Sequence, residues 1–141
     1  MMLRFGVLFS SLAGLAAYGA GPPAAPIANE VLNFRFGERH VEFIHRATEH
    51  VTVSATCFSK NAAPNCEAYA AVKRASLKGL KGEMHGGVEP GAVVCAQGLH
   101  AKVVLGVDDK SNENSFCQFN DGSMVSLGGL AYHARKNDSA K

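Results

Sequence analysis

The stretch EPGAVVCAQGLHAKVVLGVDDKSNENSFCQFNDGSMVSL, residues 89–127, carries the strongest signals for the fold. Pro90 suits the first position of a helix and Gly98 suits its end, so a short helix is predicted between them. A polar turn and the tight-turn sequence Asn120-Asp121-Gly122 then separate three β-rich segments. These segments are Ala101–Val107, Ser115–Phe119 and Ser123–Leu127. The stretch therefore predicts a helix followed by a β-meander.

Upstream, residues 31–57 alternate and are rich in Val, Phe, Ile and Thr, which is typical of strands. The candidates are Val31–Phe36, Arg39–Arg46 and His50–Thr56. A helix is expected between Cys66 and Leu77, and a glycine-rich connection follows it. The predicted class is α+β: a small disulfide-stapled domain over residues 30–134, with antiparallel strands, two short helices and the C-terminal helix plus β-meander. Residues 135–141 are expected to be a frayed tail.

The N-terminal residues have the pattern of a secretory signal. Arg4 precedes the uncharged stretch Phe5–Tyr18, which ends in small residues. Residues 1–19 are therefore interpreted as a cleaved signal peptide, since the stretch is short and interrupted for a membrane anchor. Residues 20–29 are interpreted as an extended Pro- and Ala-rich N-terminus without a core.

The four cysteines are Cys57, Cys66, Cys95 and Cys117. After export to the periplasm or the extracellular space, an even number of thiols favours two disulfides. We favour Cys57 with Cys66 and Cys95 with Cys117, because each pair closes a local loop. Partly free thiols, and a metal or catalytic role, are the alternatives.

Composition and charge exclude several classes of function. The chain has 141 residues, 18% of them charged, and a formal net charge of +2. It is too short for a multidomain enzyme and too neutral for a nucleic-acid binder. No catalytic or phosphate-binding motif occurs, so neither an enzymatic activity nor a cofactor is predicted.

The predicted function is binding of another protein or an envelope component, as an inhibitor or an envelope accessory factor. Membrane contact is not expected beyond the signal peptide. The glycine-rich segment 78–87 is the candidate contact loop, through Leu80, Met84 and His85. A plain connector is the alternative for this segment.

Two of the six histidines offer a rival function. In a hairpin with a four-residue loop, His45 would lie opposite His50. Neutral imidazole is a common metal ligand and titrates near neutral pH, so this pair would suit a metal- or pH-responsive protein. No further ligands stand at a recognised metal-site spacing.

The motifs PGAVVCAQG (90–98) and FCQFNDGS (116–123) resemble a family of small exported domains of unknown function that is often labelled haemolysin. The resemblance is confined to the C-terminal stretch that these motifs span. It implies an exported, disulfide-linked helix-and-hairpin unit without catalytic residues. The family label also implies a membrane-active protein as a further alternative, to be tested by vesicle leakage.

Overall fold

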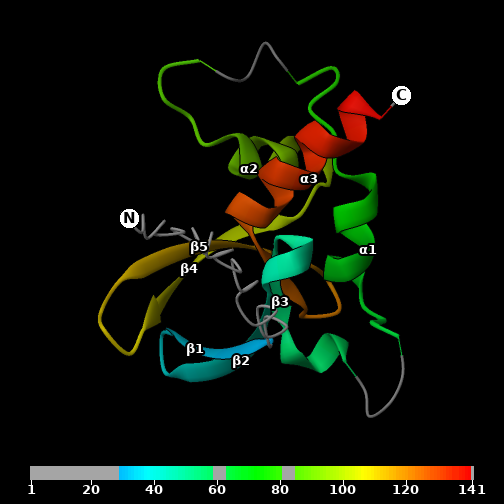
Figure 1. Cartoon of the computed structure of the whole chain (residues 1–141). Coiled ribbons are helices and arrows are strands. Elements are labelled where there is room, and N and C mark those ends of the chain that lie inside the picture. Colours follow the sequence, from blue (N-terminus) through cyan, green and yellow to red (C-terminus); the bar gives the residue numbers. More distant parts are fainter. Residues whose placement is uncertain (1–28, 59–62, 81–84, 141) are drawn as a thin grey trace, which may run out of the picture.

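The fold is a closed antiparallel β-barrel covered on one side by helices (Figure 1). The computed structural model describes residues 29–58, 63–80 and 85–140. Within them the strands are β1 (Glu30–Phe36), β2 (Arg39–Arg46), β3 (Val51–Ser54), β4 (Lys102–Asp108), β5 (Glu113–Gln118) and β6 (Met124–Ser126). The helices are α1 (Glu67–Arg74), α2 (Pro90–Val93) and α3 (Leu127–Ser139), with short turns η1 (Ala47–Glu49), η2 (Ala55–Cys57) and the π-helical η4 (Val94–Gly98).

The α+β class predicted from the sequence is therefore wrong, because the two groups of strands form one barrel. Its strand order is β1-β2-β3-β6-β5-β4, so each meander, β1–β2–β3 and β4–β5–β6, supplies half of the wall. The halves are joined at Val53 opposite Val125 and at Arg35 opposite Val107. Local alternation predicted most of the strands, but it carries no information about pairs more than 70 residues apart.

Large apolar side chains fill the interior of the barrel. Phe34, Phe43, Phe116 and Met124 are all buried there. The rings of Phe43 and Phe116 lie 4.5 Å apart between centroids, and those of Phe34 and Phe116 lie 4.9 Å apart. Both halves of the chain therefore contribute to one aromatic core, which stabilises the closed form.

A second core lies between the barrel wall and the helices. Strand residues that alternate with the interior ones, such as Val53, Cys117 and Val125, are fully buried there against α1, α3 and η4. In Figure 1 the helices gather at one side, and the β1–β2 hairpin lies at the other. The outer face of β3, β5 and β6 is thus covered, while much of β1 and β4 faces solvent.

Helix α3 continues to Ser139, so residues 135–139 of the expected frayed tail 135–141 are helical and the domain extends to Ser139. Ser126 caps α3, since its Oγ accepts a hydrogen bond from the Gly129 N–H. Near the other end, Asn137 Nδ2 donates to the carbonyls of Val72 and Ala75 at the end of α1. The tail is ordered because these distant backbone groups supply its hydrogen-bond partners.

The two disulfides join Cys57 to Cys66 and Cys95 to Cys117, the pairs favoured by local loop closure. Such bonds persist in oxidising compartments, so the protein is an exported one. The predicted signal peptide, residues 1–19, lies outside the described residues. Most of the predicted extended segment 20–29 lies outside them as well. No helix among the described residues is long and apolar enough to cross a membrane.

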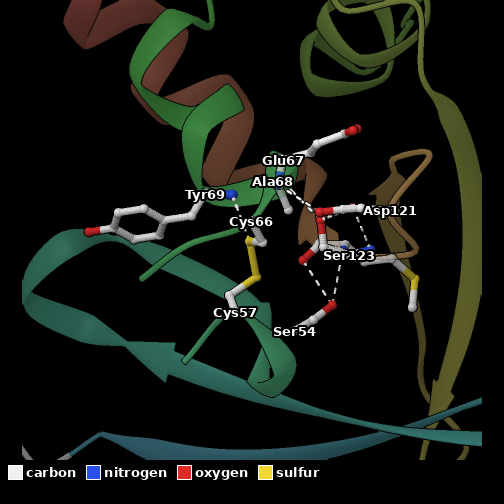
Figure 2. Close-up of a disulfide and its surroundings, with 9 residues drawn as sticks. Ser54, Cys57, Cys66, Glu67, Ala68, Tyr69, Asp121 and Ser123 are labelled. Atoms are coloured by element: carbon white, nitrogen blue, oxygen red, sulfur yellow. Dashed lines mark hydrogen bonds between the residues drawn. A yellow bond between two sulfur atoms is a disulfide. The ribbon is translucent and has the colours of Figure 1, made fainter. Parts of the chain in front are cut away.

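Figure 2 shows how the Cys57–Cys66 disulfide and the Asp121 turn meet at the start of α1. The Asp121 carboxylate accepts a hydrogen bond from the Glu67 N–H at 2.8 Å, and Ser123 Oγ accepts one from the Ala68 N–H at 2.9 Å. Burial works to raise the pKa of Asp121, but the hydrogen bonds from Glu67 and Ser123 outweigh it and hold this pKa below its ordinary value. The second half of the chain therefore caps the helix that belongs to the first.

Candidate functional site: the free half-edge of β4

Strand β4 has a strand partner on both sides for only part of its length. It pairs with β5 from Lys102 to Val107, but with β1 only at Val107 and Asp108. Within the described chain, Lys102–Leu105 therefore has a neighbouring strand on one side only. We call this segment the β4 half-edge.

The direction of the free backbone groups follows from the hairpin. The Asp108 N–H donates to the Asn112 carbonyl at 3.0 Å across the β4–β5 turn. Because successive residues of a strand point their N–H and C=O groups to opposite sides, even-numbered residues of β4 face β5. Val103 and Leu105 therefore direct their N–H and C=O groups away from β5, toward the side on which β1 has already ended.

The same two residues also expose apolar side chains. Val103 is 37% exposed and Leu105 is 59% exposed on the outer face of the barrel. Proteins usually protect a strand edge with charges, proline or a covering element. Here the charged residue within the half-edge is Lys102, at its start.

An outer groove of about 380 Å³ lies beside Val103. Helix α2 and the η4 turn form its other wall, and most of its lining is apolar. The lining residues are Val88, Ala92, Val93, Ala96, Gln97 and Val103. Behind it, the Cys95–Cys117 disulfide ties η4 to β5, and Cys117 is the cross-strand neighbour of Val103. The disulfide therefore fixes the η4 wall of the groove to the sheet.

An inner groove of about 320 Å³ opens at the adjacent mouth of the barrel. It exists because Gly37, at a φ of +62°, turns the chain from β1 back into β2 and leaves the space beyond Phe36 empty of strand. The lining residues are Phe36, Gly37, Arg39, Val104, Leu105, Gln118 and Met124.

Two basic residues lie at the half-edge and the inner groove. Arg39 lines the inner groove, and Lys102 begins the half-edge. Neither groove is lined by an Asp or Glu among the described residues. An acidic ligand segment would therefore meet attraction here.

The loop residues singled out in the sequence lie elsewhere. Leu80 is half-buried, packs against the helix-side core and lines a cleft with Val94 and Leu99. Its side chain is therefore engaged within the protein to a degree that the glycine-rich pattern did not indicate. His85 is exposed, and Met84 lies outside the described residues.

The histidine pair is not formed, which corrects the predicted register. His45 lies opposite Thr52, and its Nδ1 is 2.8 Å from Thr52 Oγ1. His50 follows the η1 turn with a left-handed backbone conformation. The centroid of its ring lies 4.3 Å from that of Tyr132. The loop has the expected four residues, but it lies at Ala47–His50 rather than at residues 46–49, so the pairing shifts by two residues. In the part of the chain that the structure describes, no three His, Cys, Asp or Glu residues are placed to hold a metal ion.

A cleft between η1, α1 and α3 is lined by side chains that bond to one another. Glu49 pairs with Arg46 at 2.6 Å and accepts a hydrogen bond from the Tyr69 hydroxyl at 2.9 Å. Burial and this hydrogen bond raise the pKa of Tyr69. The bond between Glu49 and Tyr69 holds η1 against α1.

Comparison with protein-family models, with curated proteins and with solved structures finds no match to this chain. The site must therefore be judged from its own geometry. Sequence reasoning placed Val103, Val104 and Leu105 in a strand, and such an apolar run is typical of a strand buried on both faces. Only the early end of β1 at Phe36 reveals that, within residues 29–58, 63–80 and 85–140, no strand pairs with one side of this segment.

Proposed function

We propose that this protein is an exported, non-enzymatic binding protein whose partner is another protein that docks on the β4 platform. We define this platform as Val88, Ala92, Ala96, Val103 and Leu105. The observation that carries the proposal is the exposed pair Val103 and Leu105 beside an apolar groove. A contiguous apolar surface of this kind costs solubility unless a partner covers it, so it marks an interaction site.

Rigidity supports the proposal. The Cys95–Cys117 disulfide fixes η4, and therefore the outer groove, against β5. A surface that is already ordered loses little conformational entropy when a partner binds. The platform is thus suited to recognition rather than to a reaction that needs moving parts.

The proposal also covers the compartment and the role of the protein. The protein acts in the periplasm or the extracellular space, as an inhibitor or an envelope accessory factor. The resemblance of the 90–98 and 116–123 motifs to the haemolysin-labelled family supports this proposal, because that resemblance implies an exported helix-and-hairpin unit without catalytic residues. The platform draws on the same unit, through α2, η4 and β4.

The test is capture followed by a direct affinity measurement. The mature protein, with its disulfides intact, is used to isolate a partner from the periplasmic and extracellular fractions of its native source. The purified partner is then titrated against native protein, Leu105→Asp and the matched control Val31→Asp, which alters an exposed valine of β1.

We expect Leu105→Asp to weaken binding by about tenfold or more, since it places a charge in an apolar contact, and Val31→Asp to leave it unchanged. Equal affinities of Leu105→Asp and native protein would contradict the proposed function.

A further inference from the structure

We propose that the β4 half-edge binds an extended segment of another protein, which adds to the barrel as a strand. The segment carries small side chains such as those of valine and threonine at successive positions, and carboxylates at its ends. This inference rests on the proposed function and names the chemistry of its partner.

The backbone provides the first argument. The N–H and C=O groups of Val103 and Leu105 point to the side where β1 no longer pairs with β4. A strand laid along this side would satisfy these groups in the same geometry that β1 uses at Val107. Among the described residues no strand fills this side, because Gly37 turns β1 away, and a Cβ at Gly37 would meet no atom within 4 Å.

The side chains provide the second argument. Successive side chains of an added strand point to opposite faces of the sheet. On one face they would enter the outer groove beside Val103, and on the other the inner groove beside Val104. A groove on each side of one free edge is the arrangement that alternating side chains require. The two volumes, about 380 and 320 Å³, are open to solvent and admit small apolar groups such as those of Val or Thr.

The basic residues beside the half-edge predict carboxylates in the ligand segment. Lys102 and Arg39 lie at the half-edge and the inner groove, without an acidic residue in either described lining. Carboxylates at the ends of the ligand segment would pair with these cations. The same charges oppose edge-to-edge pairing of two copies of this chain, since each copy would bring Lys102 and Arg39 to the contact.

A docked helix fits less well. It could cover the outer groove, but it would leave the N–H and C=O groups of Val103 and Leu105 without partners in a partly desolvated contact. It would also leave the inner groove unused. The observations therefore favour a strand.

The first test uses a defined peptide probe with the native, disulfide-bonded protein. The probe is a short blocked peptide of alternating valine and threonine with glutamate at both ends. Two variants carry N-methyl groups on alternate amides, one set on each edge of the extended peptide. Binding is followed by titration, and the exchange of the Val103 and Leu105 amide hydrogens is followed by NMR.

We expect saturable binding below about 1 mM, with slowed exchange at Val103 and Leu105. Because added strands bond through one edge, one methylated peptide should lose binding by about tenfold or more and the other should keep it. Unchanged exchange at both amides at about 1 mM peptide would overturn the inference, and so would equal binding of both methylated peptides. Dimers of the native protein that Leu105→Asp dissociates would also overturn it, since a second copy would then occupy the edge.

A second test separates this inference from the proposed function. Val103→Pro removes the outward N–H but no donor of the β5 ladder, whereas Val104→Pro removes a ladder donor and serves as the folding control. For the captured partner, strand addition predicts that Val103→Pro weakens binding by about tenfold or more while the circular dichroism stays native. If Leu105→Asp abolishes binding and Val103→Pro does not, the partner docks without adding a strand, and only the further inference fails. If neither change affects binding, the proposed function fails as well.

Discussion

The two halves of the barrel present their free strand edges differently. Since β1 and β4 pair with each other over a short stretch, each leaves its first residues without a neighbour on one side within the described chain. In β1 this segment is Glu30–Asn33, where the charged Glu30 and the polar Asn33 flank Val31 and Leu32, and of these two only Val31 is an exposed large apolar residue. In β4 it is Lys102–Leu105, where Val103 and Leu105 are both exposed and a groove lies on each face.

The difference teaches that a similar topology does not produce a similar surface. Both meanders send aromatic side chains into one interior, and both are followed by a helix on the same side of the barrel (Figure 1). The first edge exposes one large apolar side chain between a charged and a polar end, whereas the second exposes two and has a charge only at its start. Stability is therefore shared between the halves, and binding is expected from the second alone.

The largest effect should come from the shared interior. Phe43→Ala and Phe116→Ala should each lower the free energy of unfolding by about 3–5 kcal/mol, because each removes a buried ring from the same cluster. Urea unfolding followed by circular dichroism measures this, with exposed Val31→Ala as the control. A large loss for one phenylalanine and a small loss for the other would show that the halves do not share one core.

The disulfides should come next. Replacing Cys95 and Cys117 together by alanine should cost slightly more than replacing Cys57 and Cys66, at about 3 against 2–3 kcal/mol. The chain-entropy term grows with the sequence separation, which is 22 for the first pair and 9 for the second. Thermal unfolding of both double variants checks the order, and a reversed order would place the more important constraint in the first half.

The Asp121 cap links the halves and should have a smaller effect. Asp121→Ala should lower stability at neutral pH by about 1 kcal/mol, because the first N–H group of α1 loses its acceptor. The folded-state pKa of Asp121 is below its ordinary value of 3.8, so the ionised group stabilises the fold above that pH, and this contribution is lost as the pH falls through the lower folded value.

Urea titrations at several pH values test this expectation. The difference between native protein and Asp121→Ala should shrink in acid, whereas exposed Asp109→Asn should show no such difference at neutral pH. A difference that is independent of pH would mean that the carboxylate charge is not involved.

The smallest effect on stability should be at the two free edges. Leu105→Lys and Val31→Lys should each change the free energy of unfolding by no more than about 0.5 kcal/mol, because both side chains are largely exposed. Differential scanning calorimetry measures both. A loss above about 1 kcal/mol for Leu105→Lys would mean that the platform is part of the core rather than a binding surface.

The elements that were predictable from the sequence are those with a local signal. Strands β1, β2, β4, β5 and β6 follow alternation and turn residues, and α2 follows Pro90 at its first position. The favoured disulfide pairs are likewise close in sequence. For β3 the strand itself was expected, but its register was not, because η1 has no strong turn signature.

Helix α3 was missed because its start looks unfavourable. Gly128 and Gly129 lower helix propensity, yet a Cβ at Gly129 would lie 2.9 Å from Ser126 Oγ and 3.4 Å from the His50 carbonyl oxygen. Close packing therefore requires a small residue there. Burial of Leu130 and Ala134 and the bonds from Asn137 to α1 then stabilise the helix, and none of these is visible in the local sequence.

The sequence alone predicted most of the strand segments and the two disulfide pairs, because each depends on residue chemistry or on neighbours along the chain. The tertiary structure decided how the two meanders close, and with that which part of β4 has a neighbour. It also decided that the Asp121 turn caps α1. These contacts join residues far apart in sequence, and loop-closure entropy and packing select them rather than local preference.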